Sequence, residues 1–301
     1  MDVVVSGSSG LIGRALRSAL IAAGHGVRRL VRRPPSRPDE IAWDPDHGTI
    51  DTQGLEGAGA VVHLAGESIG ARRWNEDHKA RVYASRVRGT RLLAETLARL
   101  DRPPGTLVGA SAVGYYGDRG TEVLTEDSSP GTGFLARVCI EWEAATEPAR
   151  QAGLRVACIR TGLVLSAEDG LLPRMLLPFR LGLGARLGRG DQYWSWITIS
   201  DEIRAILHLL TTDVAGGVNL TSPNPVTNAD FTRILGRVLG RPAALRVPAA
   251  VLRVGLGAEM ARDMMLGGQR VRPTRLLESG FTFHDPDLEP ALRGLLGRDA
   301  A

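Results

Sequence analysis

The stretch Val3-Val4-Val5-Ser6-Gly7-Ser8-Ser9-Gly10-Leu11-Ile12-Gly13 decides the fold of this 301-residue chain. The unbroken apolar run at 3–5 is typical of a parallel strand that is covered on both faces. Apolar residues then recur at helical spacing over 11–23, and the glycines of 24–26 end the helix. A second apolar run at 27–31 completes the unit. The pattern predicts a strand, a glycine turn, a helix and a second strand.

Three glycines of this stretch, Gly7, Gly10 and Gly13, have the spacing of a dinucleotide-binding turn. The first allows the tight turn, the second lets a pyrophosphate approach the backbone, and the third lets helix and strand pack closely. The helix N-terminus adds free N–H groups and a positive dipole end. We therefore predict a Rossmann-type cofactor site in which Leu11 and Ile12 also take part. The alternative is a glycine-rich turn without a ligand.

Two arginines, Arg32 and Arg33, stand at the end of the second strand. Proteins that select NAD place an Asp or Glu there for the ribose 2′-hydroxyl. A guanidinium cannot accept that hydrogen bond, but it binds a 2′-phosphate through charge-assisted bonds. The pair predicts NADP(H) as the cofactor. The alternative is that both arginines are merely solvated.

Strand and helix patterns alternate along the rest of the first half, which predicts a parallel sheet with right-handed crossovers. The expected strands are 60–66, 106–110 and 155–160, and the expected helices about 75–100 and 133–152. We predict the α/β class: a Rossmann-type doubly wound sheet at 1–165, with a return segment at about 193–222. A smaller, mostly helical substrate lobe would comprise 166–192 and 223–301.

Composition excludes several classes of protein. No apolar run reaches the roughly 20 residues that span a bilayer, and no secretory signal precedes the first strand. The net charge of +4 comes from arginines spread among acidic residues, which argues against nucleic-acid binding. Cys139 and Cys158 have no disulfide or metal spacing. We expect a cytoplasmic protein without a metal.

Further motifs extend from one end of the chain to the other. They are Gly7 to Gly13, His63-Leu64-Ala65-Gly66-Glu67, Arg73-Trp74-Asn75, Ser85-Arg86, Gly89-Thr90-Arg91-Leu92-Leu93, Ser111-Ala112-Val113-Gly114-Tyr115-Tyr116-Gly117, Trp142-Glu143-Ala144-Ala145, Ser195-Trp196-Ile197, Thr227-Asn228-Ala229, Phe231, Gly267-Gly268-Gln269-Arg270-Val271 and Gly280-Phe281. With them the chain resembles the extended short-chain dehydrogenase/reductases. It is most similar to the atypical, epimerase-like branch with a small C-terminal domain of unknown function, here about 248–297.

The resemblance implies further cofactor contacts. Leu64, Ala65 and Gly66 would lie beside the adenosine or the pyrophosphate, and Val164 would line the nicotinamide side. Arg86 stands where typical extended members have an active-site Asn, and in this branch it resembles a cofactor contact. The alternative for Arg86 is an exposed helix arginine.

The resemblance also shows which chemistry is absent. Hydride-transferring members use Tyr-x-x-x-Lys, in which the Lys lowers the pKa of the Tyr so that its phenol acts as acid or base. Here Leu135 and Cys139 stand at these positions. Ser111 stands at the expected strand end, and Tyr115 is the preferred proton donor. The alternatives are that Tyr115 and Tyr116 only pack, and that Cys139 is a reactive thiol.

Two functions remain open from the sequence. One is an NADP(H)-dependent, epimerase-like oxidoreductase that acts on an unknown small molecule with a non-standard proton donor. The other is a dinucleotide-binding sensor or interaction protein that has lost catalysis. Homodimerisation through the helices at about 75–100 and 133–152 is common in related folds.

Overall fold

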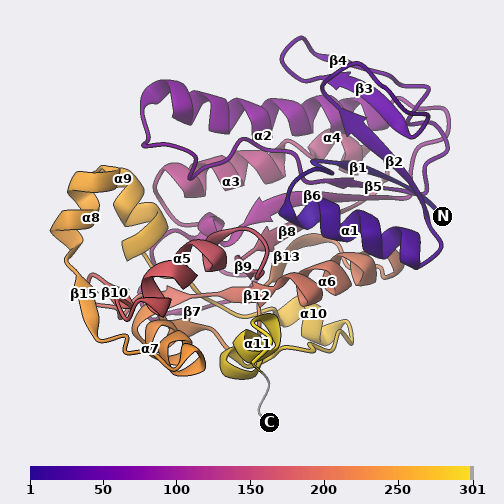
Figure 1. Ribbon diagram of the computed structural model, residues 1–301. Coiled ribbons are helices and arrows are strands. Elements are labelled where there is room, and N and C mark those ends of the chain that lie inside the picture. Colours follow the sequence, from indigo (N-terminus) through magenta and orange to yellow (C-terminus); the bar gives the residue numbers. More distant parts are fainter. Residues whose placement is uncertain (299–301) are drawn as a thin grey trace. The chain divides into compact units, whose positions relative to one another are not determined.

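The strands predicted at 3–5 and 27–31 pair in parallel within an eight-stranded sheet (Figure 1). The structure is a computed structural model that describes residues 1–298. It divides into two units. The first contains residues 1–112, 138–160 and 203–218, and the second contains residues 113–137, 161–202 and those from 219 onward.

The sheet has the strand order β13-β8-β6-β5-β1-β2-β3-β4. Strand β1 pairs in parallel with both β2 and β5, β2 pairs in parallel with β3, and β5 pairs in parallel with β6, whereas the short β4 is antiparallel to β3. The order confirms the predicted doubly wound arrangement. The strands are β1 (Asp2–Ser6), β2 (Gly26–Val31), β3 (Glu40–Asp44), β4 (Thr49–Ile50), β5 (Ala60–His63), β6 (Thr106–Ala112), β8 (Arg155–Thr161) and β13 (Gly216–Leu220).

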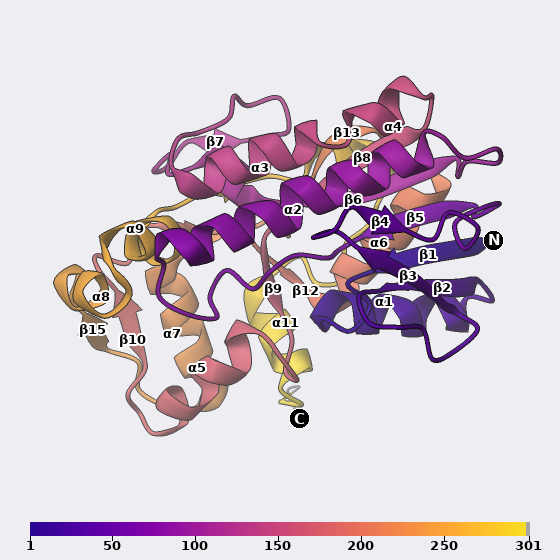
Figure 2. The same ribbon diagram turned by 90° about the horizontal axis from the view of Figure 1, so that it is seen from above.

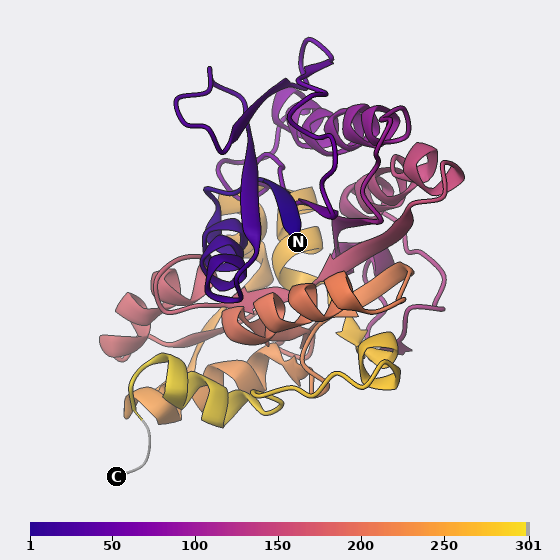
Figure 3. The same ribbon diagram turned by 90° about the vertical axis from the view of Figure 1, so that its right-hand side faces the viewer.

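Helices cover both faces of the central strands. Figure 3 shows α1 (Leu11–Ala22) on one side of β1 and β2, and α2 (Glu76–Leu97) on the other. Helix α2 packs against α4 (Glu147–Gln151), and Figure 2 shows α2 along the sheet face. Apolar residues of the strands and of α2 pack together there, and Val4, Val61, Leu93 and Leu97 are fully buried in one cluster.

The helix expected over 133–152 is two helices, α3 (Phe134–Ala144) and α4. The prediction of one helix was wrong because the hydroxyl of Thr146 donates to the carbonyl of Glu143 at 2.7 Å, and Pro148 has no N–H for the helix ladder. Helix α6 (Ile199–Thr211) runs from the second unit into the first.

The second unit contains short strands and most of the remaining helices. Helix α7 (Asn228–Leu239) packs against α5 (Leu171–Arg180) and α11 (Leu288–Leu295) around Trp196 and Phe231, both fully buried. The other elements are the 3₁₀ helix η1 (Val113–Tyr116), β7 (Val123–Leu124), β9 (Leu163–Leu165), β10 (Ala185–Leu187), β11 (Tyr193–Trp194), β12 (Trp196–Thr198), β14 (Val226–Thr227), β15 (Leu245–Val247), α8 (Ala249–Leu256), α9 (Ala258–Ala261), the π-helix η2 (Arg262–Leu266), β16 (Arg270–Val271) and α10 (Thr274–Glu278). Figure 2 shows β10 beside β15, with which it pairs in parallel.

None of the helices within residues 1–298 is both long enough and apolar enough to cross a membrane.

Candidate functional site

The glycine turn between β1 and α1 is built for close contact with neighbouring backbone. Gly7 has φ +64°, and a Cβ there would lie 2.7 Å from the carbonyl carbon of Leu64. A Cβ on Gly13 would lie 2.3 Å from the carbonyl oxygen of Gly7. These two positions therefore require glycine. Gly10, by contrast, is the N-cap of α1, and a Cβ there would meet only the Gly7 oxygen at 3.4 Å. The protein leaves this side of the turn open to a ligand.

A cavity of about 520 Å³ lies in front of this turn. It is lined by the turn itself, the end of β2, the start of the loop after β3, and the loop that follows β5. The structure thereby brings together Gly7, Gly10, Arg32, Arg33, Leu64, Ala65 and Gly66, which the sequence assigned to the cofactor. Leu11, Ile12 and Gly13 form the first turn of α1 behind it. The cavity has the backbone cradle and the cation that a phosphorylated dinucleotide requires.

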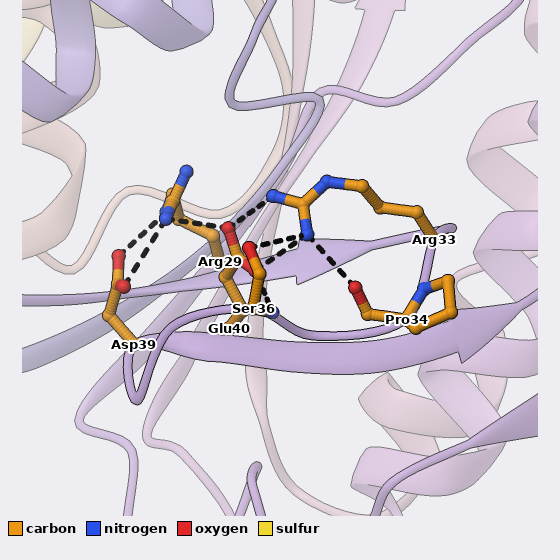
Figure 4. A network of polar contacts seen from close by, with 6 residues as sticks. All are labelled: Arg29, Arg33, Pro34, Ser36, Asp39 and Glu40. Atoms are coloured by element: carbon orange, nitrogen blue, oxygen red, sulfur yellow. Dashed lines mark hydrogen bonds and ion pairs between the residues drawn. The ribbon is translucent and has the colours of Figure 1, made fainter.

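The two arginines at the end of β2 differ in their partners (Figure 4). The Arg33 guanidinium donates to the carbonyl of Pro34, to the Ser36 hydroxyl and to the carboxylate of Glu40. Arg32 is exposed, lines the cavity, and has no hydrogen bond or ion pair within residues 1–298. Of the two predicted phosphate ligands, Arg32 alone has an uncommitted guanidinium.

Glu40 is the centre of this network. Its side chain is fully buried and also accepts from Arg29 at 2.8 Å, while Arg29 binds Asp39 at 2.7 Å. Hydrogen bonds from Arg33 and from the backbone N–H of Ser36 lower the pKa of Glu40 to about 2. The sequence analysis missed this residue. The available signal was an acidic pair, Asp39-Glu40, shortly after an arginine-rich strand.

The loop after β5 is fastened from two sides. On one side, the Ser6 hydroxyl accepts the N–H groups of Leu64 and Ala65 at 3.0 and 3.2 Å. On the other, the buried Arg86 donates to the carbonyl of Glu67 at 2.9 Å, and its guanidinium lies 3.2 Å from where a Cβ of Gly66 would be. Both contacts fix the backbone that forms one wall of the cavity.

Arg86 is not an exposed helix arginine. It is 8% exposed, and its guanidinium stacks over the Trp142 ring at 5.0 Å. Desolvation lowers its pKa. Arg86 is not among the residues that line the cavity, so the structure places it behind the loop, and direct contact with a cofactor stays a prediction.

The Ser111 hydroxyl already donates its hydrogen to a carboxylate. Its hydroxyl donates to Oε1 of Glu143 at 2.7 Å, and the buried Arg160 holds the same carboxylate through bonds of 2.8 and 2.9 Å. A hydroxyl has a single hydrogen to give. In this arrangement Ser111 can accept a hydrogen bond from an alcohol but cannot donate one to a carbonyl. In the sequence, Glu143 belongs to a motif, but nothing there predicts its pairing with Ser111.

Cys139 is a buried thiol. It is 4% exposed on α3, and burial, with Glu143 nearby, raises its pKa to about 12. A thiolate is the reactive form of cysteine, so the alternative of a reactive Cys139 is not supported.

The two tyrosines of η1 have different surroundings. Tyr116 is fully buried, and its hydroxyl donates to Asn219 at 2.7 Å, which makes it a structural residue. Tyr115 is partly exposed and meets the Tyr116 ring edge-on, with centroids 5.3 Å apart. Val164 lies in β9 of the same unit, where it pairs with Ile197.

Comparison with known proteins identifies relatives over the full chain. The model of the NAD dependent epimerase/dehydratase family matches residues 3–220, and a domain of unknown function, DUF1731, matches 247–295. An epimerase family protein of Mycobacterium tuberculosis is 47% identical over 291 residues, which cover 96% of each chain. The human epimerase family protein SDR39U1 is 39% identical over 302 residues, covering 98% of this chain and 100% of the human one.

Solved structures of related proteins agree with these sequence matches. The crystal structure of human SDR39U1 with NADPH superposes with a TM-score of 0.90 at 37% identity, covering 99% of each chain. A nucleoside-diphosphate sugar epimerase from Corynebacterium glutamicum gives 0.81 at 39% identity, with 99% of this chain and 58% of that one covered. With the glycine turn, the parallel sheet and these matches in agreement, the chain belongs to the NAD dependent epimerase/dehydratase family.

Proposed function

We propose that this protein binds NADP(H) in the 520 Å³ cavity and is an epimerase-like oxidoreductase acting on a small molecule. The observation that carries the cofactor assignment is Arg32, an exposed guanidinium that has no side-chain partner within residues 1–298 and lies at the edge of a glycine cradle. A 2′-phosphate would supply the anion that Arg32 lacks. The human relative crystallised with NADPH supports the same cofactor.

The roles of the chain's own groups follow from the site. Gly7, Gly10 and the first turn of α1 would hold the pyrophosphate with backbone N–H groups, and Leu64–Gly66 would form the opposite wall. Bound nicotinamide supplies or accepts the hydride, and the protein supplies orientation and proton transfer. We assign the proton to the Tyr115 phenol, and to Ser111 the role of accepting a hydrogen bond from a substrate hydroxyl.

The competing function is a sensor that binds the cofactor without turnover. The sequence prediction that Leu135 and Cys139 stand at the usual Tyr and Lys positions favours it, because neither side chain can do the work of a phenol–ammonium pair, and burial raises the pKa of the Cys139 thiol. Cofactor binding does not depend on either position, so it cannot separate the two functions.

Titration calorimetry with NADPH and NADH on wild type, Arg32→Ala and Arg37→Ala tests the cofactor. Arg37 is exposed and lies outside the cavity lining, which makes it the matched control. We expect Arg32→Ala to lose about 10- to 100-fold in NADPH affinity, the loss of one or two charge-assisted bonds, with NADH little changed. Equal losses for both cofactors, or no binding by wild type, would refute the assignment.

A carbonyl screen that follows NADPH oxidation separates enzyme from sensor. Where a substrate is found, Tyr115→Phe should lower kcat about 100-fold or more, while Tyr193→Phe should not. Tight NADPH binding with no turnover across the screen supports the sensor instead. An unchanged kcat in Tyr115→Phe would show that Tyr115 is not the proton donor.

The compartment and the oligomeric state belong to the same proposal. The two cysteines are free and buried, which supports a reducing, cytoplasmic compartment. We also propose a homodimer that uses the segments at about 75–100 and 133–152, which form α2, α3 and α4, and a monomeric mass in light scattering would exclude it.

A further inference from the structure

Two segments of the second unit, residues 170–190 and 231–258, contain arginines but no acidic residue. They hold nine arginines, in a chain with 37 basic and 33 acidic residues and a net charge of +4. Because the segments are far apart in the sequence, the arginines look evenly spread there. The fold joins them, since β10 in the first segment pairs in parallel with β15 in the second. The net positive charge of the chain is therefore concentrated where these two segments meet.

The two segments form one continuous surface. Figures 1 and 2 both show α5, β10, β15 and α8 side by side. A Cβ on Gly184 would lie 2.8 Å from the Cβ of Ala243, and the N–H of Leu245 donates to the carbonyl of Gly184 at 3.2 Å. We call the exposed residues within 174–186 and 241–254 the basic face.

Five arginines of the basic face have no partner in the described chain. Their side chains are exposed and make no hydrogen bond or ion pair within residues 1–298; they are Arg174, Arg180, Arg186, Arg241 and Arg253. Arg246, by contrast, donates to the carbonyl of Gly188 at 2.6 Å. A guanidinium binds phosphate through charge-assisted bonds, so the five free groups favour a partner that presents several phosphates.

The basic face also exposes large apolar side chains. Their exposed fractions range from 50% for Leu245 to 77% for Val254, and the others are Leu177, Leu181, Leu183 and Val251. Helix α8 is the extreme case: Arg253 is its only charged or polar residue, yet none of its residues is buried. An apolar helix normally buries one side, so this surface is suited to an apolar partner outside the chain.

Apolar and cationic side chains alternate across the basic face. On α5, Arg174, Leu177 and Leu181 have the spacing of one stripe along a helix. On β15, the exposed Leu245 is followed by the exposed Arg246. The partner must therefore meet charge and hydrocarbon over the same area.

The observations favour one of three kinds of partner. Single-stranded nucleic acid stacks its bases on aromatic side chains, but the aromatic residues of the two segments, Phe179 and Phe231, are buried. A second copy related by two-fold symmetry would bring unpaired arginines against one another. A bilayer of anionic phospholipid has phosphates at its surface and hydrocarbon directly beneath them, which suits both kinds of side chain.

We infer that the basic face docks on the surface of a bilayer that contains anionic phospholipid. The five free arginines bind headgroup phosphates, and Leu181, Leu183 and Val254 enter the boundary of the acyl chains. A protein that lies on a bilayer in this way needs no membrane-spanning helix. The inference does not depend on the proposed function, because every residue that lines the cofactor cavity belongs to the first unit.

Co-sedimentation of the full chain with lipid vesicles tests the charge. We expect binding to vesicles of phosphatidylcholine and phosphatidylglycerol in equal parts, little binding to phosphatidylcholine alone, and weaker binding at high salt. Arg180→Gln/Arg241→Gln/Arg253→Gln should weaken binding about 100-fold, which is about fivefold for each arginine. The matched control is Arg37→Gln/Arg72→Gln/Arg99→Gln, which removes three exposed arginines of the first unit and should have little effect.

A second pair of variants tests the apolar contact. Leu181→Gln/Val254→Gln should weaken binding to the mixed vesicles about tenfold or more. Ile21→Gln/Leu277→Gln, which changes two exposed apolar residues outside the basic face, is the control. All of these side chains are exposed, so the Tm of each variant should equal that of wild type.

A fluorescent label reports docking without any loss of binding. Both native cysteines are buried, so an environment-sensitive fluorophore can be attached to Leu181→Cys, with Ile21→Cys as control. We expect a blue shift on the mixed vesicles for the first label alone. The inference is overturned by a wild type that ignores the mixed vesicles or binds both kinds equally, by equal losses in variants and controls, or by an unshifted label. Binding to a DNA duplex as tight as to the vesicles, with no effect of Leu181→Gln/Val254→Gln, would also overturn it. NADPH titration of the same samples reports separately on the proposed cofactor site.

Discussion

The Ser6 hydroxyl lies 2.7 Å from Nδ1 of His63, with both residues fully buried. Because Ser6 already accepts two backbone N–H groups, its own hydrogen must go to Nδ1. His63 is therefore neutral, with its hydrogen on Nε2. Burial lowers its pKa to about 4, in agreement with this state. The pair links the end of β1 to the end of β5, the two strands that carry the cofactor loops.

Replacing Ser6 should loosen this link. Ser6→Ala leaves the N–H groups of Leu64 and Ala65 without an acceptor, so we expect a loss of about 1–3 kcal/mol in the free energy of unfolding. NADPH affinity should fall as well, because the loop at 64–66 is one wall of the cavity. Urea denaturation and calorimetry measure both effects. Ser18→Ala, which removes only an exposed bond to Arg14, is the control, and equal losses in the two variants would contradict the prediction.

From the ion pair between Arg33 and the buried carboxylate of Glu40 we predict a loss of stability in acid. The pKa of Glu40 is about 2 in the folded chain and about 4.5 ordinarily, so folding favours the charged carboxylate. Its contribution is present above pH 4.5 and is lost as the pH falls from about 4.5 to about 2. Wild type should show this loss in denaturant melts.

Glu40→Gln is the variant that checks the assignment. It should be less stable than wild type at pH 7, because Arg29, 11% exposed, and Arg33 lose their shared carboxylate. The difference should narrow as the pH approaches 2. Asp39→Asn is the matched control: Asp39 also binds Arg29 but is 40% exposed, so we expect a smaller effect. A wild-type to Glu40→Gln difference that is constant from pH 7 to pH 2 would refute the assignment.

The sequence predicts those parts of the fold that local patterns determine without contacts to residues far away in the chain. The run Val3–Val5, the glycine turn and the helix from Leu11 are confirmed because strand propensity, turn geometry and helical spacing agree there. Within the return segment expected at about 193–222, the strands β11 and β12 are separated by Ser195. Its hydroxyl donates to the carbonyl of Gln269 and accepts the N–H of Val271, partners more than 70 residues away. No local pattern contains that information.

The same limit applies to the candidate site. Gly7 and Arg32 could be assigned from the sequence because a motif places them at strand ends. The partners that decide what Arg33 and Ser111 can do, Glu40 and Glu143, depend on how side chains meet in space.

Because Glu202 is buried, we predict that the folded chain loses stability as the pH rises above the ordinary pKa of a glutamate. Its side chain is fully buried, Oε1 accepts from the Thr161 hydroxyl at 2.9 Å, and Oε2 has no hydrogen-bond partner within the described chain. Desolvation by burial raises its pKa to about 8. The folded state thus favours the protonated acid, and stability is lost as the pH rises from the ordinary value of about 4.5 to about 8.

Glu202→Gln stays neutral and can still accept from Thr161, so it should remove this dependence. At pH 8 it should be more stable than wild type by on the order of a few kcal/mol, and at pH 4 the two should be nearly equal. Denaturant melts from pH 4 to pH 9 measure the difference, with the exposed Glu278→Gln as control. A Glu202→Gln variant that is less stable than wild type at pH 8 would mean that the charged carboxylate is stabilised in the fold.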